Sequence, residues 1–168
     1  MSTFFEFDEV DTFTAAAIGD PGSRVFYLHA RSGQQRVTVK CEKQQVTAIA
    51  QYLRRVLSDL PPPEDRPLPV DLHDPGEQSF VLGPIGLGYD RSNDRLLVQL
   101  EEVVTTTGEE DEDEAPDADR GHVRLYVTRG QAAAFCERAD ELVAAGRPLC
   151  VWCGNPIDRD GHPCPRMN

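Results

Sequence analysis

The chain has 168 residues, enough for one domain, with or without a small module, and enough to bury a real core. No apolar run approaches the ~20 residues of a membrane span, and no signal-peptide pattern opens the chain, so we expect a cytoplasmic protein. The formal net charge is −12, but positions 109–119 hold eight acids and no base, which leaves −4 on the rest.

The first sixty residues read as strands followed by a helix. A strand is expected at 3–7 and an apolar segment at 13–18, followed by strands at 24–30 and 36–41 that flank a turn at Ser32 and Gly33. Apolar residues then recur every three or four positions, which predicts a helix over 43–58. Its buried stripe should be Val46, Ile49, Ala50, Leu53, Val56 and Leu57.

A proline-rich stretch at 60–75 indicates a linker or an extended crossing over the surface. Within it, His73 lies close to Asp71 and Asp74. A metal-binding or acid–base role for these three residues stays open, although the composition favours a solvated loop.

The second half begins with strand patterns at 78–83 and 87–90, a turn at 91–94, and strands at 95–105 and 121–127. The glycine-rich run from Gly83 to Gly88 does not open a helix, so it is not a phosphate loop. We expect a β-bulge or a close approach of two backbones there.

A second helix should begin after Thr128, with Gln131 placed for a capping box, and run to about 145, where Gly146 ends it. It should bury Phe135, Ala139, Leu142 and Val143. Gln45-Val-x-Ala-Ile in the first helix matches Gln131-Ala-x-Ala-Phe in the second. The match suggests a strand–strand–helix repeat over 24–58 and 78–146, although convergent patterning explains it as well.

These elements predict an α+β fold, in which a mostly antiparallel sheet of about six or seven strands carries two helices on one side or at its ends. The body should span 1–147 and a C-terminal tail 148–168. The acidic loop at 108–120 should be disordered. It could be a solvated loop tip, a docking segment for a basic partner or a sink for divalent cations.

The tail carries the clearest chemistry in the chain. Cys150, Cys153, His162 and Cys164 supply three thiols and one imidazole within fifteen positions, which is a ligand set that tetrahedral zinc accepts. Four protein ligands leave no vacancy for water or substrate, so the predicted zinc ion is structural. A redox pair of cysteines and a chance grouping are the alternatives.

Residues around these ligands fit a compact turn. Gly154 can adopt the positive φ that turns backbone N–H groups toward the sulfurs. Trp152 either shields the metal or packs on the body, or it stays exposed as an anchor for a partner. Elsewhere, Cys41 and Cys136 lie on apolar faces as core residues, and His29 lies in a strand as a satisfied, partly buried histidine.

Several stretches together resemble an actinobacterial family of uncharacterised proteins, domain of unknown function 3090. The most specific stretch is Ala-Ala-Gly-Arg-Pro at 144–148, then Cys-x-x-Cys-Gly-x-Pro-x-Asp at 150–158 and Gly-His-x-Cys-Pro-Arg-x-Asn at 161–168. A proline usually follows the first cysteine in that family, where Val151 stands here. The resemblance implies an actinobacterial, cytosolic protein and supports the metal interpretation, but it implies no activity.

No catalytic constellation is present in the sequence, so the leading hypothesis is a non-enzymatic adaptor or regulatory protein that binds a protein partner. An enzyme of unrecognised type is the alternative, with its site near Asp71, His73 and Asp74 or along Gly83 to Gly88. Nucleic-acid binding by the tail is a second alternative, since Arg147, Arg159 and Arg166 lie in or beside it, but an acidic chain disfavours it.

Overall fold

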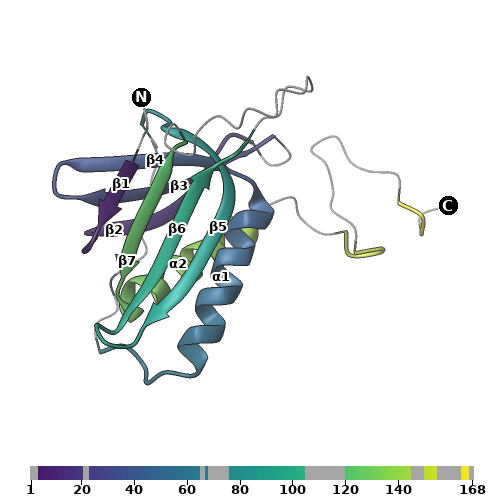
Figure 1. The fold of residues 1–168 in the computed structure, drawn as a ribbon. Helices are drawn as coiled ribbons and strands as arrows, with labels where there is room; N and C mark the ends of the chain where they lie inside the picture. The colour runs from purple at the N-terminus through teal and green to yellow at the C-terminus, as the bar shows by residue number, and fades with distance from the viewer. Residues whose placement is uncertain are drawn as a thin grey trace.

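The computed structural model describes residues 4–20, 23–64, 67, 76–104, 120–144, 150–154 and 164–166. Seven strands and two helices follow one another along these residues (Figure 1). In chain order they are β1 (Phe4–Phe7), β2 (Thr12–Ile18), β3 (Val25–Ser32), β4 (Gln35–Cys41), α1 (Lys43–Ser58), β5 (Phe80–Asp90), β6 (Arg95–Glu102), β7 (His122–Val127) and α2 (Arg129–Ala144).

All seven strands belong to one sheet in the order β1-β7-β6-β5-β4-β3-β2. Four of the six neighbouring pairs are antiparallel, while β1 with β7 and β4 with β5 are parallel. The predicted α+β fold with a mostly antiparallel sheet is therefore confirmed. Neither helix in the described part of the chain combines the length and apolarity needed to cross a membrane.

The short connection between β1 and β2 forces the sheet to curl. These two strands are at opposite edges of the seven-strand order, which would lie about 29 Å apart in a flat sheet. Residues 8–11 join them, and the step from Phe7 to Thr12 can span at most about 19 Å. The edges must therefore approach each other, and Figure 1 shows β2–β4 running across β5–β7 at a steep angle.

Helix α2 fills the inside of this curl, together with α1 on the same side of the sheet (Figure 1). Phe135 of α2 is 1% exposed and stacks on Phe13 of β2, with ring centroids 4.7 Å apart. Cys136 donates to the carbonyl of Ala50 in α1 at 3.4 Å. Because Phe13 belongs to the first half of the chain and Phe135 to the second, this contact joins the two halves. Removing a buried phenylalanine ring from such a position costs about 3–5 kcal/mol.

A glutamine side chain in the first turn of each helix makes the same kinds of hydrogen bond. Gln45 accepts from the Glu42 N–H at 2.8 Å and donates to the carbonyls of Leu82 and Gly83, both at 3.3 Å. Gln131 accepts from the Thr128 N–H at 2.9 Å and donates to the Val10 carbonyl at 2.6 Å. Each amide thus caps its own helix and binds backbone from the other half of the chain.

The capping box predicted at Thr128 and Gln131 is confirmed, because the Gln131 N–H also donates to the Thr128 hydroxyl at 3.0 Å. The bulge predicted in the glycine-rich run is confirmed as well. The β5–β6 register shifts between Leu82 and Ile85. A Cβ added at Gly83 would lie 2.7 Å from the Cα of Val103, so only glycine fits there.

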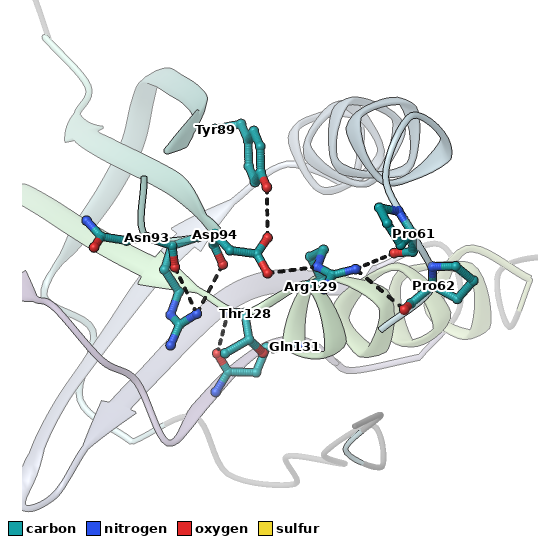
Figure 2. A network of polar contacts seen from close by, with 9 residues as sticks. Pro61, Pro62, Tyr89, Asn93, Asp94, Thr128, Arg129 and Gln131 are labelled. Atoms are coloured by element: carbon teal, nitrogen blue, oxygen red, sulfur yellow. Dashed lines mark hydrogen bonds and ion pairs between the residues drawn. The ribbon is translucent and has the colours of Figure 1, made fainter. Parts of the chain in front are cut away.

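A polar network joins the turn after β5 to the start of α2 (Figure 2). The Asp94 carboxylate accepts from the Tyr89 hydroxyl at 2.8 Å and from Nε of Arg129 at 3.1 Å. Arg129 also donates to the carbonyl of Pro61. The Tyr89 hydrogen bond and the Arg129 guanidinium lower the pKa of Asp94. One arginine therefore ties the hairpin, α2 and the segment after α1 together.

Some predicted element bounds and buried positions are wrong. The segments at 78–83 and 87–90 form one strand, because the chain stays paired with β6 past the bulge. The strand predicted at 95–105 ends at Glu102. Val143 is 36% exposed, since it lies off the stripe of α2 that carries Ala132, Phe135, Cys136 and Ala139. Val56 and Leu57 of α1 are only partly buried.

Two successive units have the same element order. The first unit is β2, β3, β4 and α1, and the second is β5, β6, β7 and α2. The repeat inferred from sequence stays a prediction, as does the boundary between a body at 1–147 and a tail at 148–168. The acidic loop predicted at 108–120 lies outside the described residues except for its last residue, Arg120.

Replacing Gln131 by Glu should destabilise the protein by about 1–3 kcal/mol. The carboxylate still accepts from Thr128, but it cannot donate to the Val10 carbonyl that it would then face. Chemical denaturation measures the change in the free energy of unfolding. Gln51→Glu, at an exposed position of α1, is the matched control and should change it by less than about 0.5 kcal/mol. Equal stabilities of the two variants would contradict the proposed anchoring role.

Candidate metal centre

Three cysteine sulfurs converge in the C-terminal part of the chain. The Sγ atoms of Cys150, Cys153 and Cys164 all lie within 4.8 Å of one another, and those of Cys150 and Cys164 are 3.9 Å apart. Cys150 and Cys164 are buried, and Cys153 is partly exposed. The predicted pairing in space of a Cys-x-x-Cys turn with a distant cysteine is therefore present, and the cluster could hold a metal ion.

The spacing of the sulfurs distinguishes a metal site from a disulfide. A disulfide holds its two sulfurs about 2.05 Å apart, so 3.9 Å leaves Cys150 and Cys164 as separate thiols. Two sulfurs bound to one tetrahedral zinc ion at about 2.3 Å from the metal lie about 3.8 Å from each other. The observed distance fits shared coordination of one ion.

The turn from Cys150 to Gly154 directs backbone amides inward. The Trp152 N–H donates to Sγ of Cys150 at 3.4 Å, and the Gly154 N–H donates to the Cys150 carbonyl at 2.9 Å. Gly154 has φ of +77°, as predicted for a residue that must turn back sharply. Hydrogen bonds from Cys153 and Trp152 lower the pKa of the Cys150 thiol, which favours the thiolate that a metal binds.

The predicted fourth ligand, His162, lies outside the described residues. The four-residue ligand set and the choice of zinc therefore stay predictions, while the three-cysteine cluster is present. Arg166 is exposed, and Arg147 and Arg159 lie outside the described residues.

The tip of the cysteine turn is apolar and open to solvent. Val151 is 92% exposed and Trp152 is 61% exposed. This exposure of Trp152 favours the interpretation in which its side chain stays exposed over the one in which it packs on the body. The alternative, an exposed aromatic side chain, describes the structure.

The other candidate sites gain less from the structure. Asp71, His73 and Asp74 lie outside the described residues. The run from Gly83 to Gly88 is the interior of β5, which agrees with its exclusion as a phosphate loop. Sequence reasoning missed a cavity of about 310 Å3 lined by Glu101, Arg120, Gly121 and His122. Alternation along β6 and β7 could have placed Glu101 beside His122, which are register partners.

Three buried polar side chains lie on neighbouring strands of the sheet. Thr14, His29 and Thr38 are buried and occupy neighbouring register positions across β2, β3 and β4. Nδ1 of His29 lies 2.9 Å from the Thr38 hydroxyl, which confirms a satisfied, buried histidine. Burial, and then the charges of Arg36 and Arg31, lower the pKa of His29. Cys41 and Cys136 are confirmed as buried core residues.

The fold and the cluster together define a curled α+β protein with a C-terminal cysteine centre. The chain belongs to the family described as protein of unknown function (DUF3090), whose profile matches residues 5–164. No curated protein and no solved structure gives a significant match to the chain. The resemblance found in the sequence is thereby confirmed at the level of the family.

Acid should destabilise the fold through His29. Its folded pKa lies below the value of about 6.5 in the unfolded chain, so protonation favours unfolding. The contribution of neutral His29 to the free energy of unfolding should be fully present above about pH 6.5 and should be lost as the pH falls below that value. His29→Asn keeps an acceptor near Thr38 but cannot titrate, so its free energy of unfolding should fall less between about pH 7 and pH 5. Parallel pH curves for both proteins would contradict the assignment.

Thiol reactivity should divide the five cysteines into two groups. Burial raises the pKa of Cys41 to about 12 and that of Cys136 to about 11, so both stay protonated and unreactive near pH 8. In the presence of a metal chelator, iodoacetamide should first modify the three tail cysteines of the folded protein. It should modify all five cysteines only after denaturation. Peptide mapping by mass spectrometry reads the result. Early modification of Cys41 or Cys136 would contradict a closed core.

Proposed function

We propose that this chain is a non-enzymatic adaptor or regulatory protein, with a structural Cys3His zinc site at its C-terminus and a protein partner. The convergence of three sulfurs on one point carries the proposal. Thiolates are soft ligands that select zinc over the oxygen-binding cations. His162, two residues before Cys164, would complete a closed tetrahedral shell.

A closed shell supports a stabilising role for the metal over a catalytic one. Zinc that does chemistry keeps one position for water or substrate. With Cys150, Cys153, His162 and Cys164 all bound, the ion would instead supply folding free energy to a segment too small for a core of its own. The exposed pair Val151 and Trp152 would then be held in one conformation by the metal, as a contact element for the partner.

Zinc stoichiometry tests the site directly. Wild-type protein purified without chelators should hold about one zinc ion per chain by elemental analysis. Cys150→Ser or Cys164→Ser should remove it and unfold the tail, while the circular dichroism of the body persists. Cys136→Ala, in the core, is the matched control and should keep its zinc. His162→Ala should weaken zinc binding, and an unchanged affinity would exclude this residue as a ligand.

A partner test separates the contact element from the metal. We infer an actinobacterial, cytoplasmic setting, so the bait is the zinc-loaded chain in an actinobacterial lysate. A specific partner should be retained by the wild type and by Trp152→Phe and lost with Trp152→Ala, all three with equal zinc content. Recovery of the same proteins by all baits, including one lacking the tail, would argue against the adaptor proposal.

A further inference from the structure

Strands β6 and β7 have one face packed in the core and one face open to solvent. Burial alternates along both strands, so that each buried residue is followed by a partly exposed one. Figure 1 shows the two strands in front of α2. The partly exposed residues form an outward β6–β7 face that consists of Leu97, Gln99, Glu101, His122, Arg124 and Tyr126. Because every one of these six residues keeps exposed surface, no described element lies over this face.

The strands on either side of this face differ in height. Gly88 of β5 is the register partner of Leu97 and so points to the same side. Apart from its chain neighbours, a Cβ added at Gly88 would meet only the Cβ of Leu97, at 3.9 Å, so the surface is low there. On the other side, Phe4 of β1 is the register partner of His122 and is 56% exposed. The outward β6–β7 face therefore has a low edge at β5 and a projecting edge at β1.

The register pairs across this face join chemically complementary side chains. The three pairs are Leu97 with Tyr126, Gln99 with Arg124, and Glu101 with His122. With its amide oxygen turned toward Arg124, Gln99 accepts from Nη2 at 2.9 Å and from Nε at 3.0 Å. A two-fold axis parallel to the strands, between β6 and β7, would place each member of a pair opposite its complement in a second copy. A symmetric interface requires this kind of self-complementarity.

We propose that the outward β6–β7 face binds the same face of a second copy of this chain. The proposal goes beyond the proposed function and does not involve the metal. Two sheets pack face to face about 10 Å apart, and the same axis sets the low edge at β5 against the projecting edge at β1 of the other copy. Four strands span about 19 Å and the eight residues of β6 about 27 Å, which gives a flat area of about 500 Å2 per copy. This area is near the lower limit for a specific interface, so the dimer should be weak and reversible.

A partner with charge of a single sign fits this face less well. Arg124 lies beside Glu6, its register partner on β1, and Glu101 lies one row away. A nucleic acid would meet these carboxylates, and a basic peptide would meet the guanidinium group, so each would bring like charges together. A second copy presents both signs in the same rows and avoids this repulsion.

Sedimentation velocity of the zinc-loaded full chain, from about 1 to about 200 μM, tests the proposal. Wild type should shift from monomer to dimer over this range. Leu97→Glu and Leu97→Lys each place two like charges beside the two-fold axis, so each should raise the dimer Kd at least about tenfold. An equal mixture of these two variants should associate again, because opposite charges then meet. Val143→Glu and Val143→Lys make the same changes at a 36% exposed position of α2 and should stay within about twofold of wild type.

A wild type that stays monomeric at about 200 μM would overturn the proposal, and so would a dimer that both Leu97 variants leave unchanged. A mixture of the two variants that stays monomeric would exclude the two-fold arrangement. A dimer that is lost in Trp152→Ala but kept in Leu97→Glu would assign self-association to the tail instead. Zinc is measured in each sample, so failure of the metal site is distinguished from failure of this face.

Discussion

The stacking of Phe135 on Phe13 inside a curled sheet is the contact on which the rest of the fold depends. A four-residue connection draws the two edges of a seven-strand sheet together, and the curl creates a concave side that must be filled. Helix α2 fills it and meets β2 and α1 at once.

Most of the fold follows from local patterns. The sequence predicted the bounds of α1, the succession of strands along the chain and the Thr128 cap. These features were predictable because residue spacing and turn chemistry act over a few residues. The curl was not, because it depends on which distant strands pair. The exposure of Val143 was missed for the same reason, since the stripe that α2 buries is chosen by β2 and α1 and not by its own sequence.

The candidate metal site was predictable because its ligands are close in sequence and chemically unambiguous. Three of the four predicted ligands lie in the described chain, and their sulfurs converge. The direction of Trp152 could not be read from the sequence, because an indole between two ligands can turn either way. The sequence alignment of Gln45 with Gln131 acquires a meaning in the structure, where both amides cap a helix and bind a distant carbonyl.

The two units are joined side by side through only two register pairs between β4 and β5, Val39 with Phe80 and Lys40 with Val81. The helices add contacts between the two units, because α2 packs against β2 of the first unit and α1 packs against β5 of the second. Each unit's strands are therefore covered in part by the helix of the other unit. On the ribosome, the first three strands of the meander emerge long before the helix that shields them, so the nascent first unit cannot complete its core until translation has passed Ala144.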